Sequence, residues 1–406
     1  MAATFTTALV TTAPVTTAPA TTGPQRAAAP SSGREVCLTP PAVAMAWVGQ
    51  GRPHEAVAVP GVVLADGDLL VTVELATVCG SDVHTVQGHR SAATPLVLGH
   101  EYVGRVHSLQ GEPRTVDGVR LREGDRVVWS IMASCRACDR CMKGLPQKCR
   151  ALLKYGHERI GGRWELNGGF ATHVHLRAGT AIVKVDDSLP AEVLAPATCG
   201  TATAWAAVDR ADDIVDVDDA IVLVLGAGLI GLTASAMAAD RGARVIVADL
   251  DPVRRELALR FGAVSAVDPR DPDQLSEAVV RAGGAEVDVV IEASGSRAAV
   301  VSALETVGVG GVVVLVGSVF ATPSVAVDPE LVVRNLVTVR GVHNYRPRDL
   351  AGAVNYLHRR STTYPFAELT GDRYPLSQLD DALAAAARGE AVRVAVDPTA
   401  GATSGR

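Results

Sequence analysis

The sequence predicts an α/β protein in which an irregular β domain precedes a doubly wound domain built on a parallel sheet. Three observations lead to this fold class. Short β-like runs separated by Gly, Pro and Asp turns fill residues 35–199, whereas apolar strand patterns alternate with helical patterns over residues 200–341. A chain of 406 residues is also too long for one ordinary hydrophobic core, so we expect two domains.

The N-terminal segment, residues 1–34, is rich in Thr, Ala and Pro, and we expect a disordered tail there. It lacks a basic start and an unbroken apolar core, which argues against a secretory signal. No apolar run is long enough to span a bilayer, and the net charge of −6 with dispersed basic residues is unlike that of a nucleic-acid binder. These two features predict a protein without membrane or nucleic-acid partners. Because its cysteines are spaced as metal ligands, we also expect it to be cytoplasmic.

The β domain carries two candidate metal ligands in its loops. Cys79 offers a soft thiolate donor and His100 an imidazole donor, and each has an acidic neighbour, Asp82 and Glu101 respectively. A single Cys or His is more often a core residue, but this pair lies among glycines that let the backbone turn tightly. Four runs are expected to form the strands around them: residues 42–47, 68–76, 102–109 and 124–129.

Further along, four more cysteines fall within fifteen positions: Cys135, Cys138, Cys141 and Cys149. Four thiolates at this spacing can close tetrahedrally on one Zn²⁺ with no position left for water, so we predict a structural site. Cys199 follows on an Ala-rich helix expected from about Pro196, where a buried cysteine is usually inert packing. His157, His173 and His175 are interpreted as surface or packing residues outside the metal sites.

A dinucleotide-binding fingerprint follows a strand that begins near Ala220. Asp249 stands 23 positions after Gly226, where an acid accepts hydrogen bonds from the adenosine ribose hydroxyls and repels a 2′-phosphate. We therefore predict NAD(H) as the cofactor, with Arg254 and Gly317 as further contacts. The fingerprint residues lie between the strand and an Ala-rich helix: Gly226, Gly228, Leu229, Ile230 and Gly231.

The β/α alternation continues with three apolar runs that fit buried parallel strands, at residues 286–296, 310–319 and 336–342. It stops in the C-terminal segment, residues 342–398. There we expect amphipathic helices and a closing strand that rejoins the β domain, followed by a tail at residues 399–406. The helices are expected at residues 344–359 and 378–390, and the strand at residues 393–398.

With these motifs in view, residues 36–398 resemble the zinc-dependent medium-chain dehydrogenase/reductase family. The segments 79–82 and 99–101 resemble its catalytic zinc motif, the cysteine cluster its structural zinc lobe at residues 135–149, and Gly226–Gly231 its coenzyme motif. The resemblance implies a GroES-like catalytic domain at residues 35–199, a Rossmann domain at residues 200–341 and a C-terminal return to the catalytic domain.

The resemblance also implies an alcohol dehydrogenase that holds two Zn²⁺ and uses NAD(H). Cys79 and His100 would bind the catalytic zinc, with Cys199 or Glu101 as a third ligand. Ser81 and His84 would relay the proton that a zinc-bound alcohol releases as it becomes an alkoxide, while hydride passes between the alcohol carbon and NAD.

Finer likeness, in segments such as residues 80–91 and 341–350, is to cyclitol dehydrogenases and to alcohol dehydrogenases associated with phosphonate metabolism. A secondary alcohol of the cyclitol or polyol kind is the favoured substrate. The alternatives are a hydroxyalkyl phosphonate or phosphonoaldehyde and, less favoured, a non-catalytic protein that binds NAD and zinc. The family likeness implies a homodimer or homotetramer with a small alcohol or ketone as its partner.

Overall fold

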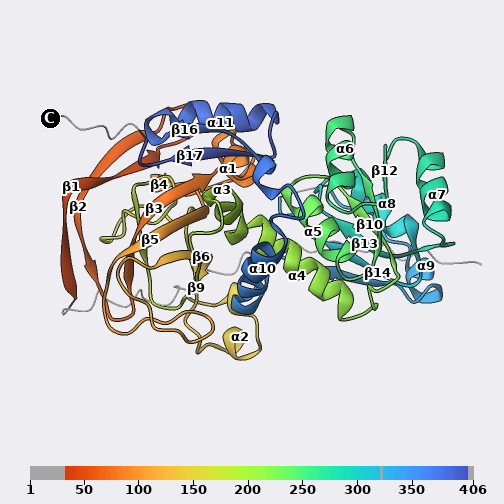
Figure 1. The fold of residues 1–406 in the computed structure, drawn as a ribbon, viewed down its shortest axis with the longest axis horizontal. Coiled ribbons are helices and arrows are strands. Elements are labelled where there is room, and N and C mark those ends of the chain that lie inside the picture. The colour runs from red at the N-terminus through yellow and green to blue at the C-terminus, as the bar shows by residue number, and fades with distance from the viewer. Residues whose placement is uncertain (1–32, 321–322, 401–406) are drawn as a thin grey trace, which may run out of the picture. The chain divides into compact units, whose positions relative to one another are not determined.

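A computed structural model describes residues 33–320 and 323–400, and it begins with the expected β domain (Figure 1). Of the tail expected at residues 1–34, positions 1–32 lie outside the described residues, as do residues 401–406 at the other end. The elements of this domain are β1 (Arg34–Trp47), β2 (Glu55–Leu64), β3 (Leu69–Thr77), α1 (Gly80–Val86), β4 (Leu96–Val97), β5 (Glu101–Leu109), β6 (Arg126–Ala133), α2 (Asp139–Met142), β7 (Leu153–Lys154), β8 (His173–Leu176), β9 (Thr180–Lys184) and α3 (Ala191–Leu194).

The four strands expected here are confirmed as β1, β3, β5 and β6. A small sheet has the order β2-β1-β4. A larger one runs β16-β17-β3-β5-β6-β7, with β8 added to β3 and β9 to β6, and it includes two strands from the C-terminal segment, β16 (Thr370–Pro375) and β17 (Arg393–Asp397). Tyr102 and Trp129 stack in the core of this domain with ring centroids 4.1 Å apart, and both side chains are fully buried. Strands β3 and β5 therefore lead out of a rigid core, and the loops after β3 and before β5 carry Cys79 and His100.

A six-stranded parallel sheet of order β12-β11-β10-β13-β14-β15 forms the second domain, as the alternating pattern predicts. Successive strand residues face opposite layers: Val222 packs in the same core as Leu232 of α5, whereas Leu223 packs with Ala278 of α7. The elements are α4 (Gly200–Asp212), β10 (Ile221–Leu225), α5 (Leu229–Ala239), β11 (Arg244–Ala248), α6 (Pro252–Arg260), β12 (Ser265–Val267), α7 (Pro272–Arg281), β13 (Val287–Glu292), α8 (Arg297–Thr306), β14 (Val307–Leu315), α9 (Pro329–Arg334) and β15 (Thr338–Gly341).

The last strand of the C-terminal segment lies in the sheet of the first domain. Strand β17 pairs antiparallel with β3, with Ala395 opposite Thr77, and Figure 1 shows the blue strands β16 and β17 beside the orange strands of the first domain. The amphipathic helix α10 packs against α4. These elements are α10 (Pro347–Arg360), β16 (Thr370–Pro375), α11 (Leu379–Arg388) and β17 (Arg393–Asp397).

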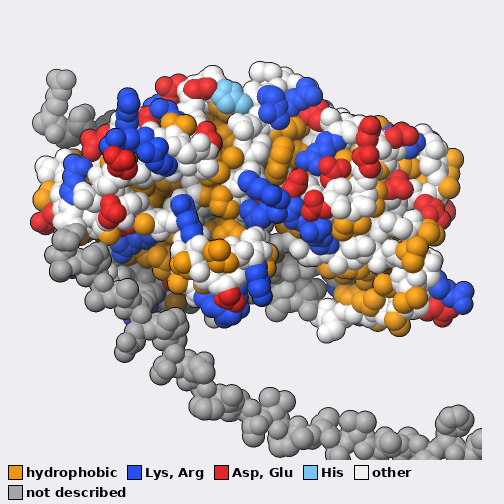
Figure 2. Space-filling model, turned by 90° about the horizontal axis from the view of Figure 1, so that it is seen from below, with side chains coloured by type: hydrophobic (Ala, Val, Ile, Leu, Met, Phe, Trp, Pro, Cys, Tyr) orange, Lys and Arg blue, Asp and Glu red, His pale blue; other side chains and the backbone are white. Residues whose placement is uncertain are grey.

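The surface seen in Figure 2 carries acidic and basic side chains close together, with hydrophobic side chains between them. Many charged side chains of the described residues form ion pairs, such as Arg260 with Glu368 at 2.7 Å. Within the described part of the chain, no helix has both the length and the apolar character that crossing a membrane requires.

Candidate active site

Cys79 lies where β3 has ended and α1 begins. The side chain of Asp82 turns back to this junction, and its Oδ2 accepts a hydrogen bond from the backbone N–H of Cys79 at 3.0 Å. The other carboxylate oxygen accepts from the N–H of Gly99 at 3.3 Å. Gly99 has φ of +87°, a conformation that favours glycine, and directly precedes His100. Asp82 therefore ties together the two loops that carry Cys79 and His100.

Cys199 completes a group of three donors. The helix expected from about Pro196 starts instead at Gly200, because Ala195–Thr198 forms a 3₁₀ turn. Cys199 stands at the junction with φ of −131° and ψ of −78°, outside helical geometry. Its Sγ, the Sγ of Cys79 and a ring nitrogen of His100 all lie within 4.8 Å of one another. Two sulfurs and one imidazole suit zinc, and three protein ligands leave a fourth position for another molecule.

The electrostatics of this group favour a cation. A hydrogen bond from Cys199 holds the pKa of the Cys79 thiol well below its usual range, and His100 and Arg393 act in the same direction. The pKa of the Cys199 thiol is raised, chiefly by that same hydrogen bond, so Cys79 is the thiolate of the pair. Burial opposes a charge on His100, but Asp82 and Cys79 raise its pKa to about 10. A thiolate beside an imidazole that neighbouring anions keep protonated is a donor set in which a metal ion can replace the proton.

Glu101 is bound to another partner. Its carboxylate accepts from Nε and Nη2 of Arg393 at 2.7 and 2.9 Å and from the hydroxyl of Thr77 at 2.7 Å. Burial raises the pKa of Glu101 to about 7, although Arg393 opposes this shift. Of the two candidates for a third ligand, the structure brings Cys199 to the donor pair and joins Glu101 to Arg393.

Arg393 is a site residue that sequence reasoning missed. Its Nη2 lies 4.0 Å from the Sγ of Cys79, close enough to favour a thiolate there. The sequence signal that could have indicated Arg393 was the predicted closing strand, because this strand, β17, pairs with the end of β3 just before Cys79. The backbone N–H of Val78 donates to the carbonyl of Val394 at 2.9 Å, which sets Arg393 beside Cys79.

The two expected relay residues line the same cavity. The Oγ of Ser81 lies 3.2 Å from Nε2 of His100, so this hydroxyl stands at the donor cluster. The ring of His84 lies against Phe320, with centroids 4.5 Å apart, and its Nδ1 is 3.3 Å from Nδ1 of His89. Burial, and then His89, lower the pKa of His84, which leaves its ring neutral at pH 7 and able to accept a proton.

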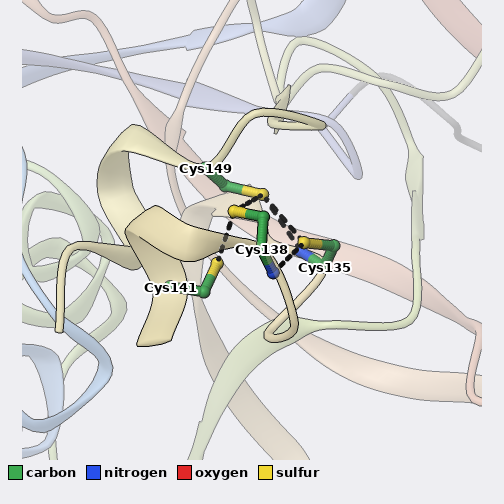
Figure 3. A group of neighbouring side chains, drawn as sticks. All are labelled: Cys135, Cys138, Cys141 and Cys149. Atoms are coloured by element: carbon green, nitrogen blue, oxygen red, sulfur yellow. Dashed lines mark hydrogen bonds between the residues drawn. The ribbon is translucent and has the colours of Figure 1, made fainter. Parts of the chain in front are cut away.

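The four clustered cysteines converge as Figure 3 shows. Consecutive sulfurs lie 3.4 Å apart from Cys135 to Cys149, 3.9 Å from Cys149 to Cys138 and 3.6 Å from Cys138 to Cys141. Backbone N–H groups point at the sulfurs, and two of them, from Arg150 and then Cys141, lower the pKa of Cys138 to about 6. The donor set is four sulfurs with no other ligand type, which fits a closed zinc site.

The glycine-rich loop lies between β10 and α5, as expected. Gly226 has φ of +102°, and a Cβ on Gly231 would lie 1.8 Å from the carbonyl oxygen of Gly226, so both positions need glycine. Gly228 precedes the first residue of α5 and leaves backbone N–H groups free for an anion. Asp249 accepts from the N–H of Ala227 at 2.6 Å, and Arg254 flanks Gly228.

One cavity of about 280 Å³ joins the donor cluster to this loop. Its wall includes Gly228, Leu229, Ile230 and Gly317 from the coenzyme domain. On the other side it includes Cys79, Ser81, His84, His100 and Cys199. Basic residues that the sequence did not place in the site also line the cavity: Arg90, Lys154, His157 and His343.

The three histidines expected to be surface or packing residues lie in different surroundings. His157 packs on His100, with ring centroids 5.1 Å apart. His175 is buried against Asp68, and His173 lies beside His107.

Comparison with known proteins agrees with this geometry. Residues 65–187 match the family model of the alcohol dehydrogenase GroES-like domain, and residues 230–359 match that of zinc-binding dehydrogenases. The chain is 31% identical to 5-exo-hydroxycamphor dehydrogenase of Pseudomonas putida over 82% of its own length and 93% of that protein. It is 30% identical to sorbitol dehydrogenase of Halalkalibacterium halodurans over 81% and 91% of the respective chains.

A solved structure from Sinorhizobium meliloti 1021, described as a zinc-binding dehydrogenase and bound to NADP, has a TM-score of 0.75 and 26% identity. It covers 88% of this chain and 99% of its own. The GroES-like and Rossmann domains expected from the sequence are thus confirmed. The chain is an oxidoreductase that belongs to the zinc-binding alcohol dehydrogenase family.

Proposed function

We propose that this protein oxidises a secondary alcohol with NAD as the hydride acceptor. The observation that carries the proposal is the single cavity lined both by Cys79, His100 and Cys199 and by the glycine-rich loop. A donor set suited to zinc and a loop suited to a dinucleotide therefore open onto the same space of about 280 Å³.

Cys79, His100 and Cys199 would hold the catalytic zinc, and the four-cysteine lobe would hold a second. When bound, the catalytic zinc supplies a Lewis acid that lowers the pKa of an alcohol hydroxyl, and the nicotinamide supplies the hydride acceptor. Ser81, whose hydroxyl stands at the donor cluster, would take up the proton first. His84 would pass it on, because its neutral ring borders the cavity and touches the exposed His89.

The substrate we favour is a secondary alcohol of the polyol or cyclitol kind. One relative is named for sorbitol and another for a cyclic alcohol, hydroxycamphor, so related proteins act on both open and ring alcohols. A hydroxyalkyl phosphonate is the second candidate, and the basic side chains in the cavity are the observation that favours it.

For the cofactor, we propose NAD with Asp249 at the adenosine ribose. A carboxylate in this position repels a 2′-phosphate. We expect Asp249→Ala to lower kcat/KM for NAD relative to NADP by roughly tenfold or more, as a change of about 1.4 kcal/mol would do. Steady-state kinetics with both cofactors measure this ratio, and Asp249→Asn serves as a control that keeps an acceptor for Ala227 N–H. An unchanged ratio would contradict the assignment.

An activity screen tests the proposal as a whole. The zinc-loaded protein is expected to carry two equivalents of zinc per chain and to form NADH with alcohols from a panel of cyclitols, polyols, simple alcohols and hydroxyalkyl phosphonates. Elemental analysis and absorbance at the NADH band are the measurements. Binding of zinc and NAD without oxidation of any alcohol would favour the non-catalytic alternative.

A further inference from the structure

Basic side chains gather in the part of the cavity next to the donor cluster. Arg90 comes from the loop after α1, Lys154 from the short strand β7, and His343 from the loop after β15. Lys148 reaches His343 from outside the cavity wall, with its Nζ 2.6 Å from Nδ1 of that ring. Hydride transfer from an alcohol needs none of these four side chains, so their presence calls for a separate explanation.

Neutral partners hold two of these groups in place. His157 donates from Nδ1 to the carbonyl of Tyr155 at 2.8 Å, so its Nε2 is the acceptor for Arg90 Nη1 at 2.8 Å. Lys148 likewise donates to His343. The guanidinium and the ammonium group are thus oriented by uncharged rings, and the anions that act on Arg90, which are Asp82 and the Cys79 thiolate, act on it without a direct ion pair.

No carboxylate among residues 33–320 and 323–400 lies within ion-pair distance of the side-chain nitrogens of Arg90, Lys148 or Lys154. Elsewhere a buried guanidinium has its anion, as Arg126 has Glu74 at 2.6 Å. Burial, and then Arg90 and Lys148, lower the pKa of Lys154 to about 8, although the site thiols oppose this. Arg90 and Lys154 are partly buried, whereas Lys148 is exposed. Keeping the two partly buried cations near each other costs free energy, and an anion bound to both would offset that cost.

The coenzyme phosphates have other partners available. The backbone N–H groups at the start of α5 can bind a phosphate on the coenzyme side of the cavity, where Gly228 lies. Arg90 and Lys154 belong instead to the catalytic domain, and the charges that act on Lys154 include the thiols of Cys79 and Cys199. The basic group is therefore placed for the part of the cavity that an alcohol would occupy.

We infer that Arg90 and Lys154, with Lys148 and His343 behind them, bind an anionic group carried by the substrate alcohol. The inference rests on the proposed function and narrows its substrate to a secondary alcohol, open-chain or cyclic, that also bears a carboxylate, phosphate or phosphonate. Arginine and lysine both bind such groups, arginine in a bidentate manner.

A binding experiment tests the site without turnover. Full-length, zinc-loaded protein saturated with NADH, which fills the coenzyme phosphate site, is titrated calorimetrically with methylphosphonate, acetate and uncharged dimethyl methylphosphonate. We expect at least one of the two anions to bind more tightly than the uncharged ester. Lys154→Met and Arg90→Gln should each weaken that binding by roughly 10- to 100-fold, the usual worth of a hydrogen bond to a charged group.

Lys184→Met is the matched control, since Lys184 is an exposed lysine that pairs with Asp125 away from the cavity. It should bind all probes as the unaltered protein does. Equal affinity for the charged and uncharged probes, or anion binding that survives both cavity substitutions, would overturn the inference. The two anions also separate the sources, because a preference for methylphosphonate points to a phosphonate or phosphate and a preference for acetate to a carboxylate.

Kinetics then distinguish the inference from the function on which it rests. The NAD-linked oxidation of 3-hydroxybutyrate and 2-hydroxypropylphosphonate is compared with that of uncharged 1,3-butanediol. We expect a higher kcat/KM for an anionic alcohol, with the advantage lost in Lys154→Met. Oxidation of 1,3-butanediol with no advantage for either anion would keep the proposed function and reject the anion site. Anion binding that depends on Lys154, with no alcohol oxidised, would keep the site and reject the function.

Discussion

Replacement of Ser81 by alanine is expected to slow alcohol oxidation by roughly 100-fold or more while zinc content and NAD binding stay nearly unchanged. The physical reason is the position of the hydroxyl, 3.2 Å from Nε2 of His100 and in the cavity wall, where it can take the proton of a bound alcohol. Single-turnover formation of NADH measures the rate, and elemental analysis with NADH fluorescence measures the two kinds of binding.

Two controls separate proton transfer from a structural effect. Ser81→Thr keeps a hydroxyl at the same position and should retain most of the activity. His84→Gln should lose activity that small bases such as imidazole partly restore, because His84 acts later in the same path. An unchanged rate in Ser81→Ala would remove Ser81 from the relay.

The pH dependence of the reaction follows from the lowered pKa of His84. A histidine accepts a proton only while neutral, and the folded protein keeps this ring neutral to a lower pH than the ordinary value of 6.5. The relay contribution to alcohol oxidation should therefore persist to a lower pH than a histidine of ordinary pKa allows, and it should be lost as the pH falls through the lowered pKa. In His84→Gln the pH profile of kcat should lack this contribution throughout.

The proposed metal ligands and cofactor-binding residues that the sequence predicted are those that lie close together along the chain. The gaps among Cys135, Cys138, Cys141 and Cys149 and the glycines after β10 depend on short-range geometry, so residue type and separation were sufficient. Cys79, just before α1, could likewise be proposed as a ligand from its sequence neighbourhood, whereas the role expected for Ser81 rests on the family resemblance. The strands on either side of these residues were predicted from the periodicity of apolar residues, and those apolar residues are buried in the sheets.

The rest of the site depends on contacts between distant segments. Arg393 and Glu101 are 292 positions apart in the sequence and form an ion pair in the fold. Glu101 therefore binds Arg393, and Cys199 is the residue that lies beside Cys79 and His100. Lys154 lies in a two-residue strand opposite Met132, where no periodicity shows which way its side chain faces. Arg90 and His157 likewise come together only in the fold, across 67 positions. The local sequence pattern thus predicted the proposed zinc ligands and the glycine-rich loop, whereas the basic residues of the cavity wall could be found only from the structure.

The four-cysteine lobe supplies the second large effect. Cys141→Ser should abolish zinc binding at the proposed lobe site and lower the free energy of unfolding by several kcal/mol. This lies below the roughly 10–16 kcal/mol with which zinc binds small peptides whose whole fold depends on it. The loss is smaller here because the lobe closes one loop of a domain that has its own hydrophobic core. Urea unfolding and elemental analysis measure the two quantities.

Cys37→Ser is the matched control, since Cys37 is an exposed cysteine outside both donor groups, and it should change neither zinc content nor stability. The lobe variant should also affect the cavity. Lys148 immediately precedes Cys149 and contacts His343 at the cavity wall, so opening the lobe releases one of the basic side chains. We therefore expect Cys141→Ser to raise KM for an anionic alcohol more than for 1,3-butanediol. A variant with one zinc, full stability and unchanged KM values would show that the lobe supports neither the fold nor the substrate-facing wall.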